Sequence, residues 1–383
     1  MTRLDGSWLR DPATLRVMEA LIGGGHRALF VGGCVRNELL GAPVSDIDIA
    51  TDALPDRVAA LAAKAGLKPV PTGADHGTVT VIADAKPHEV TTFRRDIRTD
   101  GRRADVTFTD DIVEDARRRD FTINALYAEA DGTLRDPLGG FADLTARRVR
   151  FIEDAERRIR EDYLRILRFF RFHAWYGDPA QGLDAEGYAA CARLASGMSV
   201  LSRERVGAEM KKLLAAPDPA PAIAAMAQAP VLGQVLPGAV DAPLSVLVHL
   251  EQVVAAGPDP LRRLAVLGGE DAAPRLRLSR KEAARLALLR DGIGSTAGTA
   301  ELSYRFGSET AGDIELLRAA TFGAPLPARL LADLALGAAA EFPVTPADLM
   351  PRYQGRALGQ RLAELERRWI ASGFSLGRDD LLG

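Results

Sequence analysis

The stretch over residues 28–50 places two glycines ahead of two aspartates, and this combination narrows what the chain can fold into. An apolar run over 28–31 ends in Gly32 and Gly33, and residues 34–40 then read as a short helix. Consecutive glycines let backbone N–H groups come close to a phosphate at a helix N-terminus. The start of this stretch therefore predicts a strand, a phosphate-binding turn and a helix.

A second strand is predicted directly after this helix, and it carries Asp46 and Asp48. Side chains two residues apart on a strand share a face, so the two carboxylates are expected to project together. Adjacent carboxylates repel each other, and a divalent cation with oxygen ligands is the usual remedy. Arg36 could add a charged donor to the phosphate. The combination favours a nucleotide site with a metal over a solvated, aspartate-rich strand edge.

The totals describe an ordinary globular chain. With 383 residues, 47% of them hydrophobic, it should contain two or more domains. No apolar run reaches the roughly 18 residues of a membrane span, and the N-terminus lacks a signal-peptide pattern. Two distant cysteines, Cys34 and Cys191, suggest a reducing compartment, so we expect a cytoplasmic protein. The formal charge of −3 argues against a globally basic nucleic-acid binder, so any basic surface must be local.

The first 150 residues mix helices with short strands. Helices are predicted over 11–22 and 54–65, and strands over 78–83 and 88–93, which together give an α/β or α+β head.

Glu89 lies on the last of these predicted strands. If that strand lies beside the one with Asp46 and Asp48, Glu89 becomes a third carboxylate at the metal; otherwise it is a solvent-facing glutamate. Residues 94–111 are polar and without period, which predicts a mobile loop.

Three consecutive arginines precede an apolar stretch within residues 117–126. Asp120 and Asn124 are four residues apart, which predicts one helical face. Arg119 could hold nucleotide phosphates or sugar while Asp120 and Asn124 order the site by hydrogen bonds. A basic helix start with an ordinary cap is the alternative.

After residue 153 the strand signals vanish and helices dominate. A polar stripe recurs every three residues on one predicted helix: Asp162, Arg165, Arg168 and Arg171. The opposite side should point into a core with Leu164, Leu167, Phe170 and Trp175. An aspartate accepts hydrogen bonds and an arginine donates them, which matches the amine and ring nitrogen of both cytosine and adenine. One Asp–Arg pair could therefore read C and A without a template, although the stripe taken by itself favours a solvated amphipathic helix.

Local composition supports a phosphate-rich ligand. Between residues 145 and 171 there are nine arginines against five acidic residues.

The composition also suggests that the chain has three parts. An Ala/Pro-rich segment at 215–237 marks a boundary. We expect a head over 1–150, a helical neck over 151–215 and a helical body and tail over 216–383.

Five motifs follow one another over residues 28–214. They read Gly-Gly-Cys-Val-Arg with Asp-Ile-Asp, Glu-Val-Thr-Thr-Phe-Arg, Arg-Arg-Asp-Phe-Thr-Ile-Asn-Ala, Glu-Asp-Tyr-Leu-Arg-Ile-Leu-Arg and Ser-Arg-Glu-Arg. In these motifs the chain resembles the bacterial CCA-adding tRNA nucleotidyltransferase and poly(A) polymerase family, in the class II branch of the DNA polymerase β superfamily. The resemblance implies an α+β fold, with a polymerase-β-like nucleotidyltransferase head of mixed sheet and helices followed by an all-helical neck, body and tail.

The resemblance also implies roles for individual residues. Asp46 and Asp48 would bind two Mg²⁺ ions and, with Glu89 as a candidate third carboxylate, form the catalytic group. The implied nucleotide-binding residues are Gly33, Arg36 and Arg119 for the phosphates and sugar, Asp162 and Arg165 for the base, and Arg168 and Arg171 in support. Gly32, Asp120 and Asn124 would hold the site in place. Residues 94–111 would help to switch between C and A addition.

One position departs from the family pattern, because Asn37 stands where an aspartate usually follows the first-motif arginine. Compared with aspartate, asparagine keeps a polar side chain and removes a charge. The role of residue 37 in the site is therefore left open.

The expected function is addition of C, C and A to the 3′ end of tRNA from CTP and ATP. The downstream helices would grip the acceptor and T arms of the tRNA, and no membrane is implied. Poly(A) polymerase shares the head motifs, and CC-adding or A-adding specialists share them too. A catalytically inactive RNA-binding protein and a small-molecule nucleotidyltransferase are the alternatives from other classes. The sequence leaves the oligomeric state open.

Overall fold

The structure is a computed structural model that describes residues 2–73, 77–100 and 103–383. It divides into two compact units. The first contains residues 1–237 with 275–277, and the second contains residues 238–274 with 278–383. Within the described residues, no helix has the length and apolar character needed to cross a membrane.

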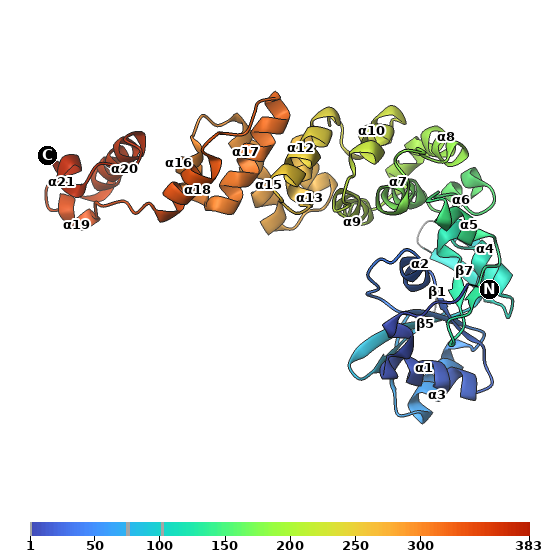
Figure 1. Cartoon of the computed structure of the whole chain (residues 1–383). Coiled ribbons are helices and arrows are strands. Elements are labelled where there is room, and N and C mark those ends of the chain that lie inside the picture. Colours follow the sequence, from blue (N-terminus) through green and yellow to red (C-terminus); the bar gives the residue numbers. More distant parts are fainter. Residues whose placement is uncertain (1, 74–76, 101–102) are drawn as a thin grey trace. The chain divides into compact units, whose positions relative to one another are not determined.

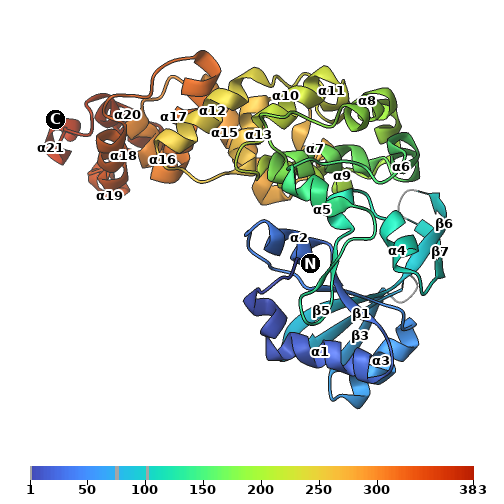
Figure 2. The same cartoon turned by 45° about the vertical axis from the view of Figure 1, so that its right-hand side comes forward.

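The described part of the first unit contains a seven-stranded mixed sheet (Figures 1 and 2). The order across the sheet is β3–β4–β5–β2–β1–β8–β9. The strands are β1 (Ala28–Val31), β2 (Asp48–Thr51), β3 (Lys68–Gly73), β4 (Thr78–Ala83), β5 (Lys86–Thr92), β8 (Tyr127–Ala128) and β9 (Leu134–Arg135). β2 and β5 pair in parallel, whereas the other neighbours pair antiparallel. β3 contains two prolines and lies at an edge of the sheet, where a missing N–H donor is tolerated.

Two predictions about strands require correction. The strand expected to carry both aspartates begins at Asp48, so Asp46 lies in the segment before it. The segment over 94–111 was expected to be a mobile loop, but its described part, which leaves out residues 101 and 102, contains β6 (Arg94–Asp100) and β7 (Arg103–Phe108), which pair antiparallel. In the described residues these two strands form a sheet of their own, and their polar sequence lacks the apolar alternation of a half-buried strand.

Helices cover both faces of the sheet (Figures 1 and 2): α1 and α3 lie on one face and α2 on the other. The helices of this part are η1 (Ser7–Arg10), α1 (Pro12–Gly23), α2 (Gly33–Leu39), α3 (Pro55–Lys64), α4 (Ile112–Arg117), η3 (Thr122–Asn124) and α5 (Gly140–Thr145). Asp120 and Asn124 do not share one helix as predicted, because α4 ends before them and only the short η3 follows.

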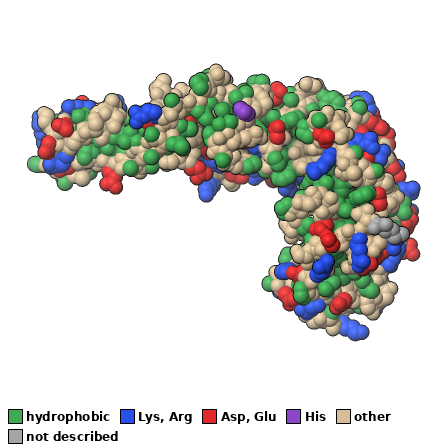
Figure 3. Space-filling model, in the orientation of Figure 1, with side chains coloured by type: hydrophobic (Ala, Val, Ile, Leu, Met, Phe, Trp, Pro, Cys, Tyr) green, Lys and Arg blue, Asp and Glu red, His purple; other side chains and the backbone are tan. Residues whose placement is uncertain are grey.

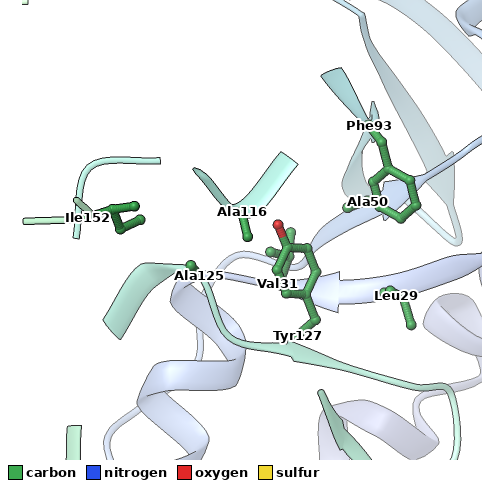
Figure 4. Close-up of a cluster of buried hydrophobic side chains, with 8 residues drawn as sticks. All are labelled: Leu29, Val31, Ala50, Phe93, Ala116, Ala125, Tyr127 and Ile152. Carbon is green, nitrogen blue, oxygen red and sulfur yellow. The ribbon is translucent and has the colours of Figure 1, made fainter. Parts of the chain in front are cut away.

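A buried cluster connects the sheet with the segments that follow the β6–β7 pair (Figure 4). Its members are Leu29, Val31, Ala50, Phe93, Ala116, Ala125, Tyr127 and Ile152. Leu29 and Val31 come from β1, so the strand that leads into the glycine turn is held by the core on this side. On the surface of the head, acidic and basic side chains lie interspersed on the face shown in Figure 3.

The rest of the first unit is helical, as the sequence predicted. Its helices are α6 (Ala155–Glu161), α7 (Leu164–Tyr176), α8 (Ala185–Leu194), η4 (Ala195–Val200), α9 (Arg203–Leu214), α10 (Ala220–Gln228) and α11 (Val231–Val235). Leu164, Leu167 and Phe170 are buried on α7 as expected. Trp175 is not a core residue, because it is 41% exposed and its Nε1 donates to the Lys212 carbonyl.

The second unit is formed by helices throughout its described length. They are α12 (Ala242–Val253), α13 (Pro260–Leu267), most of α14 (Ala272–Arg275), α15 (Arg280–Gly294), α16 (Thr299–Phe306), α17 (Ser308–Phe322), α18 (Leu330–Ala339), α19 (Pro346–Leu349), α20 (Gly355–Ala371) and α21 (Arg378–Leu382). Ion pairs join three of these helices in the interior. Glu251, 2% exposed, accepts hydrogen bonds from Arg262 and Arg263, and Arg262 also donates to Asp313 at 2.7 Å.

We predict that Glu251→Ala will strongly destabilise the second unit. The substitution leaves Arg262 and Arg263 buried without their shared carboxylate, which is expected to lower the free energy of unfolding by about 3–5 kcal/mol. Glu364→Ala, which removes an exposed partner of Arg361, should change it by less than about 1 kcal/mol. Urea unfolding monitored by circular dichroism measures both, and equal midpoints for the two variants would contradict the prediction.

Candidate active site

The turn between β1 and α2 requires glycine at its first position. Gly32 has φ 73° and ψ −118°, a conformation that residues with a side chain rarely adopt. Its N–H donates to the Leu126 carbonyl at 3.1 Å, and a Cβ built on it would lie 3.6 Å from Nη1 of Arg119. The turn is therefore fixed beside a guanidinium group at the start of a helix.

Three candidate carboxylates lie on two neighbouring strands or just before them. Asp48 and Glu89 are directly paired in the parallel register of β2 and β5. The strand with Glu89 thus lies beside the strand with Asp48, which was the condition for Glu89 to be a third carboxylate. Asp46, before β2, accepts a hydrogen bond from Ser45 at 2.9 Å. Burial raises the pKa of Asp48 to about 6, and the negative charges of Glu89 and Asp46 add to this.

The donor chemistry of these carboxylates fits a hard divalent cation. Their oxygens are the ligand type that such cations prefer. A bound cation would favour the charged form of Asp48, whose pKa is raised by burial and, to a smaller extent, by the charges of Glu89 and Asp46. Within the residues described, no group of three or more acidic, histidine or cysteine side chains is already arranged as a metal cage.

A cavity of about 450 Å³ opens next to the glycine turn within the first unit. It is lined by Gly32, Gly33, Arg36, Asp48, Arg118, Arg119, Asp120, Asn124, Asp162, Leu164, Arg165, Arg168, Arg171, Phe172 and Arg205. Of these described residues, seven are arginines and three are aspartates. This local excess of positive charge suits a polyphosphate ligand.

Asp115 positions the two arginines at the end of α4. It is fully buried, and its carboxylate accepts from Arg118 at 2.8 Å, from Arg119 at 3.1 Å and from the Tyr127 hydroxyl at 2.7 Å. Burial alone would raise the pKa of Asp115, but the Arg119 and Arg118 charges hold it well below its usual range. Burial raises the pKa of Tyr127 far above its ordinary value, so this phenol stays neutral.

A chain of hydrogen bonds runs from α7 through the 120–124 segment to α2 and back to α7. Arg168 donates to Asp120 at 2.7 Å, Asn124 donates to Asp120 at 2.9 Å, and Arg36 donates to Asn124. Arg36 also donates to the Tyr176 hydroxyl at 2.8 Å, with its guanidinium 4.0 Å from the centre of that ring. Burial lowers the pKa of Arg36. We call these five side chains the α2–α7 circuit.

Asn37 connects this circuit with the segment that leads to Asp46. Its Oδ1 accepts from Arg36 at 2.9 Å, so its Nδ2 faces the Pro43 carbonyl, to which it donates at 2.8 Å. An aspartate in the same place would turn a carboxylate oxygen toward that carbonyl. The departure from the family pattern therefore supplies a hydrogen bond that the usual residue cannot make.

Asp162 and Arg165 line the same cavity but do not pair with each other among the contacts of the described residues. Asp162 accepts from Arg205 at 2.5 Å and from a backbone N–H at the start of α7. Arg165 donates to the Glu161 carboxylate and to two backbone carbonyls. Lone pairs on Asp162 and the Nε–H of Arg165 remain available for a base edge.

Arg171 is held from a third helix, because its Nε donates to Glu209 of α9 at 2.5 Å. Its guanidinium lies 4.4 Å from the centre of the Phe172 ring, and that of Arg168 lies 5.2 Å from the same ring. Both guanidinium groups thus lie over the same aromatic ring at the cavity wall.

The structure brings most of the predicted site residues to one place. The glycines, Arg36, Asp48, Arg119, the supporting pair and the α7 stripe line the cavity, whereas Asp46 and Glu89 lie beside Asp48 without lining it. Sequence reasoning missed Asp115 and Arg205 as site residues. Arg205 could have been found from the Ser-Arg-Glu-Arg motif, whereas no local signal marks Asp115.

Comparison with known proteins agrees with the motifs. Residues 28–150 match the family described as the poly A polymerase head domain, and residues 183–242 match the family described as a probable RNA and SrmB-binding site of polymerase A. The mitochondrial CCA tRNA nucleotidyltransferase 1 of Mus musculus is 40% identical over 190 residues, which cover 49% of this chain and 44% of the relative. The chain thus matches about half the length of the first curated relatives.

Longer matches settle the family. The CCA-adding enzyme of Geobacillus kaustophilus is 35% identical over 372 residues, covering 91% of this chain and 89% of the relative. The crystal structure of Bacillus stearothermophilus CCA-adding enzyme in complex with CTP is 30% identical, with a TM-score of 0.74 over 94% of this chain and 92% of that one. The Thermotoga maritima CCA-adding enzyme complexed with tRNA, at 19% identity and a TM-score of 0.69, shares the fold. The chain belongs to the family of CCA-adding enzymes, with a polymerase-β-like head and helical segments after it.

Asp120 generates a prediction about pH. Burial alone would raise its pKa, but Arg168 and Asn124 lower it to about 2. Since the ordinary value of about 3.9 applies in the unfolded chain, the charged form should contribute roughly 2–3 kcal/mol above pH 5. That contribution is lost as the pH falls from about 4 toward 2.

The melting temperatures of the wild-type chain and Asp120→Asn, measured from pH 7 to pH 3, test this. The difference should be largest at neutral pH and narrow below about pH 4. The exposed Asp56→Asn serves as the control and should show no such trend. A wild-type advantage that is constant across the range would refute the assigned charge interaction.

Proposed function

We propose that this chain adds C, C and A to the 3′ end of tRNA, using CTP and ATP and releasing pyrophosphate. The observation that carries the proposal is the convergence on one cavity of a glycine turn, Asp48, Arg119 and the Asp162–Arg165 side chains. The first three suit a nucleoside triphosphate with a divalent cation, and the last two suit the amine and ring nitrogen shared by cytosine and adenine.

In this proposal, Asp46 and Asp48 hold Mg²⁺, with Glu89 at the side of Asp48. The bound metal would activate the primer 3′-hydroxyl and stabilise the leaving pyrophosphate. Arg119, fixed by Asp115 and Tyr127, binds the triphosphate beside the N–H groups that follow Gly32. Gly33 and Arg36 shape the wall of this phosphate site, Arg36 mainly by holding α2 in the α2–α7 circuit.

The base is expected to lie against Asp162 and Arg165, with Arg168 and Arg171 beneath it. Arg205 and Glu161 restrict these two side chains to one arrangement, so their free acceptors and donors keep fixed directions. Guanine and uracil present a carbonyl and a ring N–H, which would leave both protein groups unpaired at about 1–3 kcal/mol each. The division into head (1–150), neck (151–215) and body and tail (216–383) belongs to this proposal, with tRNA held by the helical parts.

The cytoplasmic location expected from the sequence also belongs to the proposal, and Cys34 and Cys191 are both buried free thiols. Poly(A) addition remains the second candidate, because the matching head family carries that description. Both candidates use the same head chemistry and differ in product length.

We predict that tRNA lacking its 3′ end will gain three nucleotides when CTP, ATP and Mg²⁺ are supplied together. Asp46→Ala and Asp48→Ala should each lower the rate by more than about 10³-fold, since roughly 4 kcal/mol of transition-state stabilisation depends on the metal. Asp56→Ala, an exposed aspartate on α3, is the matched control and should retain the wild-type rate. Product lengths are read at single-nucleotide resolution.

A long A ladder would replace the proposal with poly(A) polymerase, and a stop after CC would indicate a CC-adding specialist. Addition at the wild-type rate by either aspartate variant would refute the metal assignment. Absence of any addition by the wild-type chain would favour the non-catalytic RNA-binding alternative.

We also predict that Asp162→Ala will weaken base selection rather than abolish catalysis. The preference for CTP and ATP over UTP and GTP, measured as the ratio of kcat/KM values, should fall by about 5- to 150-fold. Glu156→Ala, which removes a surface partner of Arg160 on α6, should leave the ratio unchanged. Discrimination that survives in Asp162→Ala would show that another group reads the base.

A further inference from the structure

A second cavity lies in the first unit, and it shares no lining residue with the candidate active site. Its volume is about 330 Å³, and it is formed by η4, the start of α9, α11 and Arg275. Its apolar wall includes Leu201 and Val206, and its polar groups include Ser199, Gln234, Arg203 and Arg275. No acidic residue of the described chain lines it.

The segment that supplies Arg275 is fixed against α9. Leu276 is 2% exposed, and its carbonyl lies so close to Gly207 that a Cβ there would stand 1.9 Å from the oxygen. Arg277 forms an ion pair with Glu204 at 3.2 Å. Arg275 is thus held at the cavity by the contacts of the two residues that follow it. One is the backbone contact of Leu276 and the other is the ion pair of Arg277.

Neither arginine of this cavity has a hydrogen bond or an ion pair among the described residues. The Nε of Arg275 is buried and unpaired. Elsewhere in the unit, half-buried arginines meet carboxylates, as Arg171 meets Glu209 and Arg168 meets Asp120. Arg203 is exposed, whereas Arg275 is half-buried. A partly buried guanidinium without a partner is unfavourable, so an anion in the cavity would remove that cost for Arg275, with Arg203 as a second donor.

We propose that this cavity binds one phosphate-bearing nucleotide of the RNA substrate, away from the 3′ end. Arg203 and Arg275 would hold the phosphate, the apolar wall would take the face of a base or sugar, and Ser199 and Gln234 would hydrogen-bond its edge. The volume is of the size that holds a small ligand. Except for Arg275, the lining lies within residues 183–242, which match the probable RNA-binding family.

This inference rests on the proposed function, because that function supplies the RNA. The proposed ligand of the cavity is a nucleotide within RNA, not a free nucleotide. The salt dependence of RNA binding distinguishes the possibilities, since each lost phosphate contact lowers the slope of log Kd against log salt by about 0.7–1. The ligand is a fluorescent tRNA transcript lacking its 3′-terminal CCA, and the readout is anisotropy at several KCl concentrations.

We expect Arg275→Ala and Arg203→Ala each to weaken RNA binding, by about fivefold or more for Arg275, and to lower the salt slope. Arg275→Lys should retain part of the affinity because the charge remains. Arg57→Ala removes an exposed arginine of α3 and controls for the loss of one positive charge. CTP binding, measured by calorimetry, should be unchanged in all of these variants.

Affinity and slope that match the wild type in both alanine variants would overturn the proposal, as would an equal loss in Arg57→Ala. A second CTP-binding site that disappears in Arg275→Ala, with RNA binding intact, would assign the cavity to free nucleotides instead. If Arg275→Ala lowers the melting temperature, RNA binding by Arg203→Ala and Arg275→Lys decides whether the proposal holds. RNA binding that depends on these arginines in a chain without nucleotide addition would refute the proposed function and uphold this inference.

Discussion

The α2–α7 circuit is the interaction on which the arrangement of the site depends. It begins and ends on α7, at Arg168 and Tyr176, and passes through Asp120, Asn124 and Arg36. Because it closes on itself, it fixes the helix after the glycine turn against α7, which carries the proposed base-reading stripe. The two sides of the cavity, proposed here to bind phosphate and base, therefore keep one spacing, which would pre-organise the site for a ligand that contacts both.

The circuit also separates two kinds of arginine at the cavity. Arg36 and Arg168 are engaged by side chains of the circuit and mainly position other groups. Arg119 and Arg165 are held by partners on one side, Asp115 and Glu161, and keep donors for a ligand. Since arginines close together repel one another, the buried carboxylates between them keep the group stable before any phosphate binds. This division of roles is invisible in the motif, where all four residues read as candidate ligands.

Local patterns in the sequence were sufficient for the glycine turn, for α1, α2 and α3 of the head, and for the buried Leu164, Leu167 and Phe170 of α7. They failed where pairing between distant segments decides the structure. The parallel register of Asp48 with Glu89 could be stated only as a condition, because no local signal says which strands are neighbours. The same holds for Asp115, which lies in an ordinary helical turn and becomes important only when Tyr127 packs against it. Residues 94–111 contain two strands that no local pattern predicts, because their sequence lacks apolar alternation.

Net charge is a poor guide to what this chain binds, because some charged side chains are buried in ion pairs and others line a cavity. In the second unit, buried arginines meet buried carboxylates, as Arg262 and Arg263 meet Glu251, so they contribute no field outside. Around the cavity of the described first unit, seven arginines face three aspartates, although the whole chain carries −3. A concave site focuses the field of such an excess, so the local charge can attract an anion despite the net charge of the chain. A mildly acidic chain can therefore carry a strongly basic cavity.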